Sequence, residues 1–138
     1  IVLPSRITDS CIQALKKRTL KTVMVIHCNH PSEIDINVIN SLNKIHAAGI
    51  TLFNQTVLLK GVNDDSATLC NLSEALFDAN VTPYYLHLLD KVSGSAHFDV
   101  SREQAIALHQ AVLAKLPGYL CPKLVEELPG KPAKTAIY

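Results

Sequence analysis

Three short segments of the chain are almost continuously apolar and rich in β-branched or aromatic residues, which is typical of β-strands. They cover residues 22–27 (TVMVIH), 50–59 (ITLFNQTVLL) and 82–89 (TPYYLHLL). Apolar residues recur at helical spacing between these segments. This spacing predicts helices over residues 9–17, over 32–48, after the polar residues 64–66, and from the capping box of Ser101 and Gln104 to Pro117.

Strands that alternate with helices predict successive βα units and a parallel sheet, so the expected fold class is α/β. Three such units cannot close a barrel, and an open sheet of three strands leaves unpaired edges. We therefore expect a parallel half-barrel built from residues 1–116. Residues 117–138 hold four of the seven prolines and two of the five glycines. They are expected to form a loop-rich C-terminal arm with at most one short strand, residues 121–125.

Composition narrows the possible functions. Hydrophobic residues make up 48% of the chain and charged residues 18%, enough to bury a core. Thirteen basic and twelve acidic residues give a net charge of +1, which argues against a nucleic-acid binder. No apolar run approaches the roughly 20 residues of a membrane span, and no signal peptide is evident, so we expect a cytoplasmic protein. The chain opens on Ile-Val-Leu-Pro without an initiator methionine, which suggests a fragment.

The four cysteines are too far apart in the sequence for a zinc or iron-sulfur loop. They are Cys11, Cys28, Cys70 and Cys121, separated by 17, 42 and 51 positions. We expect reduced, buried thiols and no metal site held by this chain alone.

Polar residues collect where the predicted strands end, which is where parallel α/β folds bind ligands. His27 is the last residue of the first predicted strand, and Gln55 lies within the second. His87 lies near the end of the third, and Asp90 follows this strand directly. His27 and His30 have a spacing that metal ligands could share, or they hydrogen-bond a ligand or a loop. Gln55 lies in an apolar strand and needs a partner from a loop or a ligand. Asp90 could instead form a surface ion pair with the following lysine, Lys91.

The arm carries two lysines, Lys131 and Lys134. A lysine forms a Schiff base with an aldehyde cofactor if its amine is neutral, which requires desolvation or a nearby cation. The alternative is a solvated lysine in a loop.

Four motifs in register carry a specific resemblance: HCNHPSEI, NQTVLLKGVND, TPYYLHLLDKVSGSAHF and LPGKPAK. Together they resemble the carboxyl-terminal half of the lysine 2,3-aminomutase family of radical S-adenosylmethionine enzymes. Two features are most similar to the branch that makes β-lysine for modification of elongation factor P. They are the segment LLDKVSGSAHFDVS and a chain end four residues after Lys134.

This resemblance implies an isomerase that interchanges an amino group and a hydrogen between neighbouring carbons of L-lysine, giving (R)-β-lysine. It implies three cofactors: pyridoxal phosphate, S-adenosylmethionine and a [4Fe-4S] cluster. It also implies that the half-barrel is the second half of a partial TIM-type barrel.

Residue by residue, Lys134 matches the family's catalytic lysine, which binds pyridoxal phosphate. Asp90 and Glu127 match the carboxylates that bind the distal ammonium of the substrate lysine, although Glu127 stands where other members have aspartate. His27 and Gln55 match positions that contact S-adenosylmethionine. The resemblance makes Lys131 a bystander and gives supporting roles to Asn29, His30 and Asn63.

The family's cluster loop, C-x3-C-x2-C, is absent from residues 1–138, as are the arginines that bind the substrate carboxylate and the cofactor phosphate. The resemblance therefore implies that this chain needs an N-terminal half-barrel as its partner. The alternatives are an inactive fragment, or a non-radical α/β domain that binds phosphate-bearing ligands.

Overall fold

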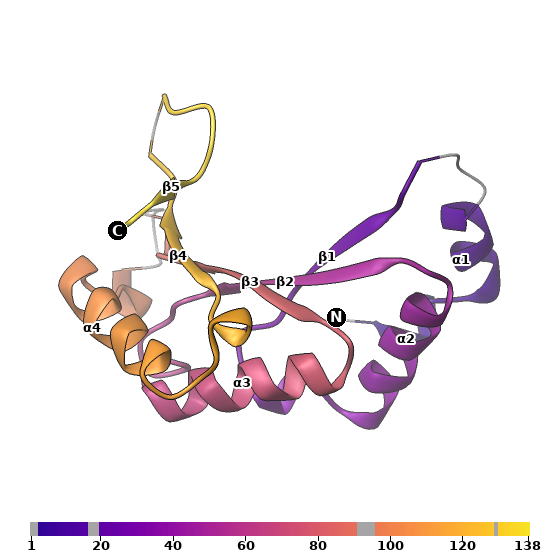
Figure 1. Ribbon diagram of the computed structural model, residues 1–138, viewed down its shortest axis with the longest axis horizontal. Helices are drawn as coiled ribbons and strands as arrows, with labels where there is room; N and C mark the ends of the chain where they lie inside the picture. The colour runs from indigo at the N-terminus through magenta and orange to yellow at the C-terminus, as the bar shows by residue number, and fades with distance from the viewer. Residues whose placement is uncertain (1–2, 17–19, 91–95, 129) are drawn as a thin grey trace.

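The computed structural model describes residues 3–16, 20–90, 96–128 and 130–138 (Figure 1). Helices and strands alternate along the chain, as the hydrophobic pattern predicts. In order they are α1 (Asp9–Lys16), β1 (Val23–His27), α2 (Ile36–Ala47), β2 (Thr51–Val57), α3 (Ser66–Asp78), β3 (Thr82–His87), α4 (Arg102–Leu113), β4 (Lys123–Glu126) and β5 (Thr135–Ala136).

The strands form one sheet in the order β1-β2-β3-β4-β5. The pairs from β1 to β4 are parallel, and β5 runs antiparallel to β4. The strand expected at residues 121–125 appears as β4, but the expectation of at most one strand in the arm was wrong. Strand β5 is two residues long, too short to leave a hydrophobic pattern, and it forms because the arm turns back onto β4.

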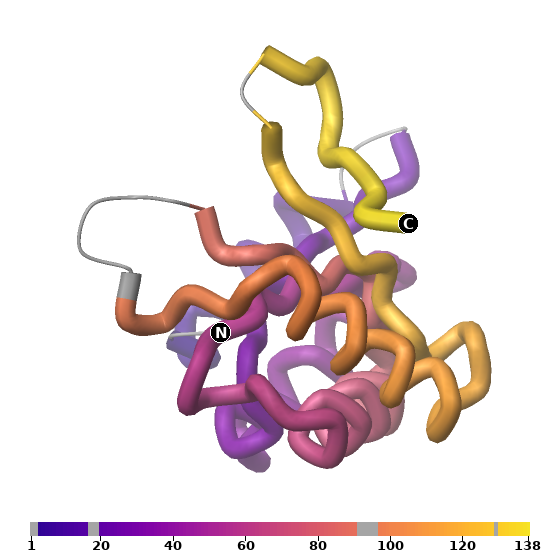
Figure 2. The backbone as a smooth tube through the Cα atoms, turned by 90° about the vertical axis from the view of Figure 1, so that its left-hand side faces the viewer, coloured from indigo at the N-terminus to yellow at the C-terminus, as the bar shows by residue number. Residues whose placement is uncertain are grey.

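Helices α2, α3 and α4 lie along one face of the sheet, and the arm rises on the other side (Figures 1 and 2). The alternation of burial along β2 reflects these two faces. Leu52, Asn54 and Thr56 are buried, whereas Phe53 and Gln55 between them are only partly buried. We call the face that carries Phe53 and Gln55 the open face.

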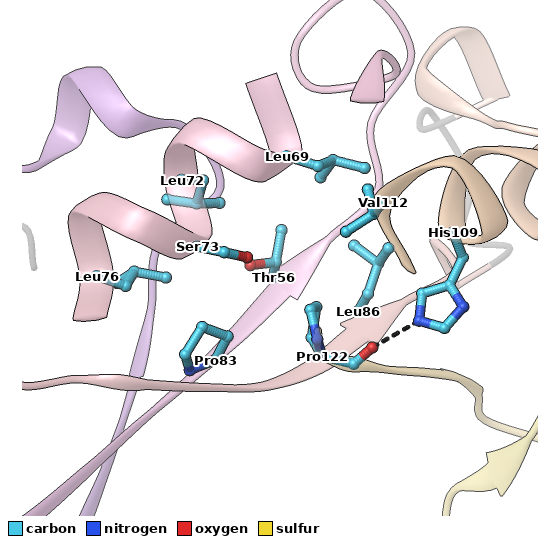
Figure 3. A pocket seen from close by; sticks show the side chains of 10 residues that line it. All are labelled: Thr56, Leu69, Leu72, Ser73, Leu76, Pro83, Leu86, His109, Val112 and Pro122. Atoms are coloured by element: carbon cyan, nitrogen blue, oxygen red, sulfur yellow. Dashed lines mark hydrogen bonds between the residues drawn. The ribbon is translucent and has the colours of Figure 1, made fainter. Parts of the chain in front are cut away.

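Two hydrophobic clusters hold the helices to the sheet. One joins β1 and β2 to α2 and α3 around Leu42, Ile45 and Leu52, and the other joins β3 and β4 to α3 and α4 around Leu86 and Val112. A cavity of about 10 Å³ lies in the second cluster (Figure 3). This cavity has room for about one water molecule, which is too little for a larger ligand.

Side-chain caps set where the helices begin. Asp35 and Asp65 accept hydrogen bonds from the first amides of α2 and α3, and Ser101 forms the predicted capping box with Gln104. Helix α2 begins at residue 36 instead of 32 because residues 31–33 form a separate 3-10 turn before the cap. None of the helices in the described ranges is long and apolar enough to cross a membrane.

A buried amide network joins the ends of β1 and β2. The side chain of Asn54, 1% exposed, accepts a hydrogen bond from the Cys28 amide (2.8 Å) and donates to the Cys28 carbonyl (3.0 Å). It also donates to Thr56, whose hydroxyl donates to the same carbonyl. Sequence reasoning placed a costly buried amide at Gln55. The structure corrects this, because Gln55 lies on the open face and its neighbour Asn54 is the buried one.

Replacing Asn54 with alanine should lower the free energy of unfolding by about 2–3 kcal/mol, because the buried polar groups of Cys28 would lose their partner. Urea unfolding of the intact protein measures this change. Asn71, exposed on α3, is the matched control, and its replacement by alanine should change stability by less than about 0.5 kcal/mol. Equal losses in the two variants would contradict the structural role of Asn54.

Candidate functional site

Neighbouring strands bring a row of side chains together on the open face. His27 of β1 pairs in register with Gln55 of β2, and Gln55 pairs with Tyr85 of β3. Residues in register on parallel strands point to the same face, so these three side chains lie side by side. The sequence predicted the positions of His27 and Gln55 but not the tyrosine that continues the row.

A shift in register between β2 and β3 adds a second tyrosine to this face. Asn54 pairs with Pro83 and Gln55 with Tyr85, which leaves Tyr84 as an extra residue in β3. The Tyr84 ring contacts Phe53 and Tyr85, with centroids 5.2 and 3.8 Å apart, and its hydroxyl donates to that of Tyr85. The floor of the site is therefore aromatic.

The arm places a lysine and a glutamate over this floor. The pairing of β4 with β5 brings Glu127 and Lys134 opposite each other, and Lys134 Nζ lies 3.3 Å from Glu127 Oε1. The same Nζ lies 5.6 Å from the centroid of the Tyr85 ring. The Lys134 side chain is 26% exposed. Lys131, which the resemblance makes a bystander, lies in the turn of the arm and is exposed.

Two side chains of helix α4 form hydrogen bonds with the C-terminal arm. Arg102 donates hydrogen bonds to Glu126 and to the carbonyl of Ile137, at either end of the strand pair. His109 is buried and bonds the Tyr138 hydroxyl and the Pro122 carbonyl, the second of these at 2.7 Å (Figure 3). The position of Lys134 is therefore set by contacts on both strands of the arm.

His87 lies at the centre of this arrangement. It pairs in register with Val57 and Val125, is 8% exposed, and packs edge-on against Tyr85 with centroids 5.6 Å apart. Its Nε2 atom is buried without a hydrogen-bond partner in the described part of the chain. The sequence showed His87 at a strand end, but burial and the lack of a partner are visible only after folding.

Four charged or titratable groups act on His87. Burial lowers the pKa of its imidazole, and the nearby Lys134 and His27 lower it further. Glu127 and Asp90 oppose them by favouring the charged imidazole. The net pKa is below the ordinary histidine value, so His87 is neutral at neutral pH. The structure thus brings all four charged or basic candidates from the sequence to one end of the sheet.

Asp90 is exposed and follows β3 directly. It lies three residues beyond His87, the last residue of β3, and therefore at the same end of the sheet. The alternative ion pair of Asp90 with Lys91 falls on a residue outside the described ranges.

Three motif residues beside the site hold its loops. The Asn29 side chain accepts from the Val57 amide, and Asn63, fully buried, donates to the carbonyls of Asn29 and Val57. His30 caps the turn that follows β1 through its ring nitrogen Nδ1, which bonds Ser32. Asn29, His30 and Asn63 therefore support the strand ends.

The cysteines lie elsewhere. Cys28 and Cys70 are buried as expected, whereas Cys11 and Cys121 are partly exposed, and all four are free thiols. Burial raises the pKa of Cys28 to about 11, so its thiol stays protonated. Within the described residues, no three His, Cys, Asp or Glu side chains gather as a metal site.

Comparison with solved structures supports the fold. A radical SAM methyltransferase from Sphaerobacter thermophilus superposes with a TM-score of 0.61 over 85% of this chain and 37% of that chain, at 17% sequence identity. The expected α/β fold class, a mostly parallel assembly of βα units, is confirmed, and its fold is similar to part of this methyltransferase. No protein-family model matches the chain.

Curated proteins match along almost the whole chain. The L-lysine 2,3-aminomutase of Escherichia coli K12 is 47% identical over 137 residues, and that of Haemophilus influenzae is 48% identical over 135 residues. The L-lysine 2,3-aminomutase of Clostridium subterminale is 34% identical over 137 residues. These matches cover 98–99% of this chain but 40% of the first two relatives and 33% of the third.

Proposed function

We propose that this chain, which belongs to the lysine 2,3-aminomutase family, forms the lysine-binding and cofactor-binding face of such an enzyme. The chain spans 40% of the length of the Escherichia coli and Haemophilus influenzae relatives. The proposed reaction converts L-lysine to (R)-β-lysine in the cytoplasm. Residues 1–116 would supply one side of the barrel, and residues 117–138 the arm with the cofactor lysine. The product would serve the modification of elongation factor P.

The surroundings of Lys134 fit pyridoxal phosphate. Its side chain is 26% exposed, and its amine lies 5.6 Å from the centroid of the Tyr85 ring. The His87 ring, whose Nε2 has no partner in the described residues, packs against the same tyrosine. When bound, this cofactor would supply an aldehyde for an amine and a conjugated ring that accepts electron density. Lys134 would hold it covalently, and the arm would cover it from water.

Glu127 and Asp90 are proposed to bind the distal ammonium of lysine. Glu127 already holds an ammonium, that of Lys134, at 3.3 Å. A half-exposed pair of this kind contributes only about 0–1 kcal/mol to stability, so a ligand's ammonium can replace it. Asp90 adds a second carboxylate at the same end of the sheet.

His27 and Gln55 are proposed to contact S-adenosylmethionine. They are neighbours in register and point to the open face, where the side-chain amide of Gln55 has no hydrogen bond within the described residues. When bound, S-adenosylmethionine would supply a carbon radical for hydrogen abstraction. The [4Fe-4S] cluster does not fit the described residues, which lack a group of ligands. We propose that the cluster and the carboxylate-binding arginines come from a second half-barrel.

The observation that carries this proposal is the convergence of Lys134, Glu127, His27 and Gln55 on one open face. The test is anaerobic incubation of the intact protein with L-lysine, pyridoxal phosphate, S-adenosylmethionine and a reductant, followed by chiral chromatography. We expect (R)-β-lysine. Turnover of S-adenosylmethionine without β-lysine would contradict the assigned reaction. Unchanged mass of elongation factor P in cells lacking the gene would contradict the assigned use of the product.

Replacing Gln55 with alanine should weaken S-adenosylmethionine binding about 10-fold, the cost of one hydrogen bond to a polar ligand. Isothermal titration calorimetry of the intact protein measures this affinity. Gln13 is exposed on α1 and provides the matched control, since Gln13→Ala should leave the affinity for S-adenosylmethionine unchanged. Labelling of Lys134 by pyridoxal phosphate should be equal in both variants, and a loss of labelling in the Gln55 variant would show that the strand itself had been disturbed.

A further inference from the structure

We propose that His87 is a third binding group for the distal ammonium of the substrate, acting with Asp90 and Glu127 as a neutral hydrogen-bond acceptor through Nε2. This inference rests on the proposed function and deepens it, because it assigns a residue that neither the sequence motifs nor the comparisons assign.

The first support is the unmet hydrogen bond. His87 is more than nine-tenths buried, and its Nε2 has no partner in the described residues. A buried polar nitrogen without a partner destabilises the fold, and a ligand that forms a hydrogen bond with it removes this cost. The imidazole therefore favours a polar ligand at this point of the sheet.

The second support is the position of the ring. Its edge packs against Tyr85, whose ring lies under Lys134 Nζ at 5.6 Å, and Lys134 Nζ lies 3.3 Å from Glu127. A ligand ammonium that took the place of Lys134 Nζ at Glu127 would enter the same end of the site. His87 is thus one aromatic ring away from the proposed ammonium.

The third support is the chemistry of an ammonium. It has three N–H donors, and two carboxylates leave one donor for another acceptor. A neutral imidazole with its proton on Nδ1 offers a lone pair at Nε2. A protonated imidazole would offer none and would repel the ammonium.

The surrounding charges decide which form is present. Lys134 on the arm and His27 on β1 disfavour the imidazolium, while Glu127 on the arm and Asp90 after β3 favour it, and Tyr85 is the further titratable group in contact. Burial is the largest influence, and it keeps the ring neutral. The neutral acceptor is therefore the form that meets the substrate at neutral pH.

The test compares lysine with L-norleucine, whose side chain has the same four carbons but no distal amine. Calorimetry on the intact protein, loaded with pyridoxal phosphate, measures the Kd of each. In the wild type, lysine should bind more tightly than norleucine. In His87→Leu we expect lysine to bind about 10- to 100-fold more weakly, with norleucine unchanged. The matched control His46→Leu, exposed on α2, should leave both Kd values unchanged.

The pH profile separates a binding role from a structural one. In the wild type, the Kd for lysine should rise as the pH falls below the ordinary histidine range, because protonation removes the acceptor. His87→Gln keeps an acceptor that does not titrate, so it should bind lysine at neutral pH, and the rise in Kd that comes from His87 should be absent. This variant also tests the inference if His87→Leu does not fold. An equal loss of lysine and norleucine binding, or a pH profile of lysine binding in His87→Gln that is identical to that of the wild type, would overturn the inference.

The two proposals fail differently. Absence of lysine binding and of Lys134 labelling in the wild type would contradict the proposed function. Normal wild-type labelling and binding, with the lysine preference intact in both His87 variants, would overturn only the role of His87.

Discussion

Replacing Lys134 with arginine should abolish covalent labelling by pyridoxal phosphate and lower lysine turnover by at least about 10³-fold. Arginine keeps the positive charge that pairs with Glu127, so the arm should keep its place. Its guanidinium stays protonated and cannot act as the amine nucleophile. The measurement is borohydride fixation of bound pyridoxal phosphate in the intact protein, followed by peptide mass spectrometry, with lysine turnover measured alongside.

Lys131 provides the matched control. It lies on the turn of the same arm, is exposed, and has no described contact with the aromatic floor. Lys131→Arg should retain both the label on Lys134 and turnover. A label that moves to Lys131, or that survives in Lys134→Arg, would remove the role assigned to Lys134.

Replacing Asp90 with asparagine should raise the KM for lysine by about 10²-fold, because the substrate ammonium would lose one of its two charged partners. The shape of the side chain is kept, so the fold should be undisturbed. Cleavage of S-adenosylmethionine in the absence of lysine should stay within about twofold of the wild-type rate, since that step does not need the substrate ammonium. Steady-state kinetics and a separate cleavage assay give the two quantities.

Asp78→Asn is a suitable comparison, since Asp78 is exposed at the end of α3, on the other side of the sheet from the site. It should change neither quantity. If Asp90→Asn lowered lysine turnover and cofactor cleavage equally, Asp90 would be maintaining the fold and not binding substrate.

Much of the fold follows from local patterns. The three predicted strands and four predicted helices are all present, with ends that differ by at most four residues. The Ser101–Gln104 capping box was predicted correctly because a cap depends on residues three apart. The start of α2 was misplaced because Pro31 and Asp35 both mark helix starts, and the chain uses the first for a 3-10 turn.

The site residues taken from the motifs stay predictions, whereas their arrangement comes from the structure. The motifs identified His27, Gln55, Asp90, Glu127 and Lys134 through resemblance, and the strand ends explained why polar residues gather there. The error at Gln55 shows the limit: alternation along a strand says that Asn54 and Gln55 face opposite sides, but not which side the helices cover.

The sequence by itself determined the alternation of strands and helices, the family, and the lysine that matches the cofactor position, because these depend on local spacing and motif identity. Tertiary structure decided which amide is buried, that Lys134 meets Glu127 above Tyr85, and that His87 is enclosed with no partner for its Nε2 among the described residues. These features depend on strand register and on the turn of the arm, which join residues far apart in the chain. Local pattern carries no information about such contacts, because their free energy appears only once the sheet has formed.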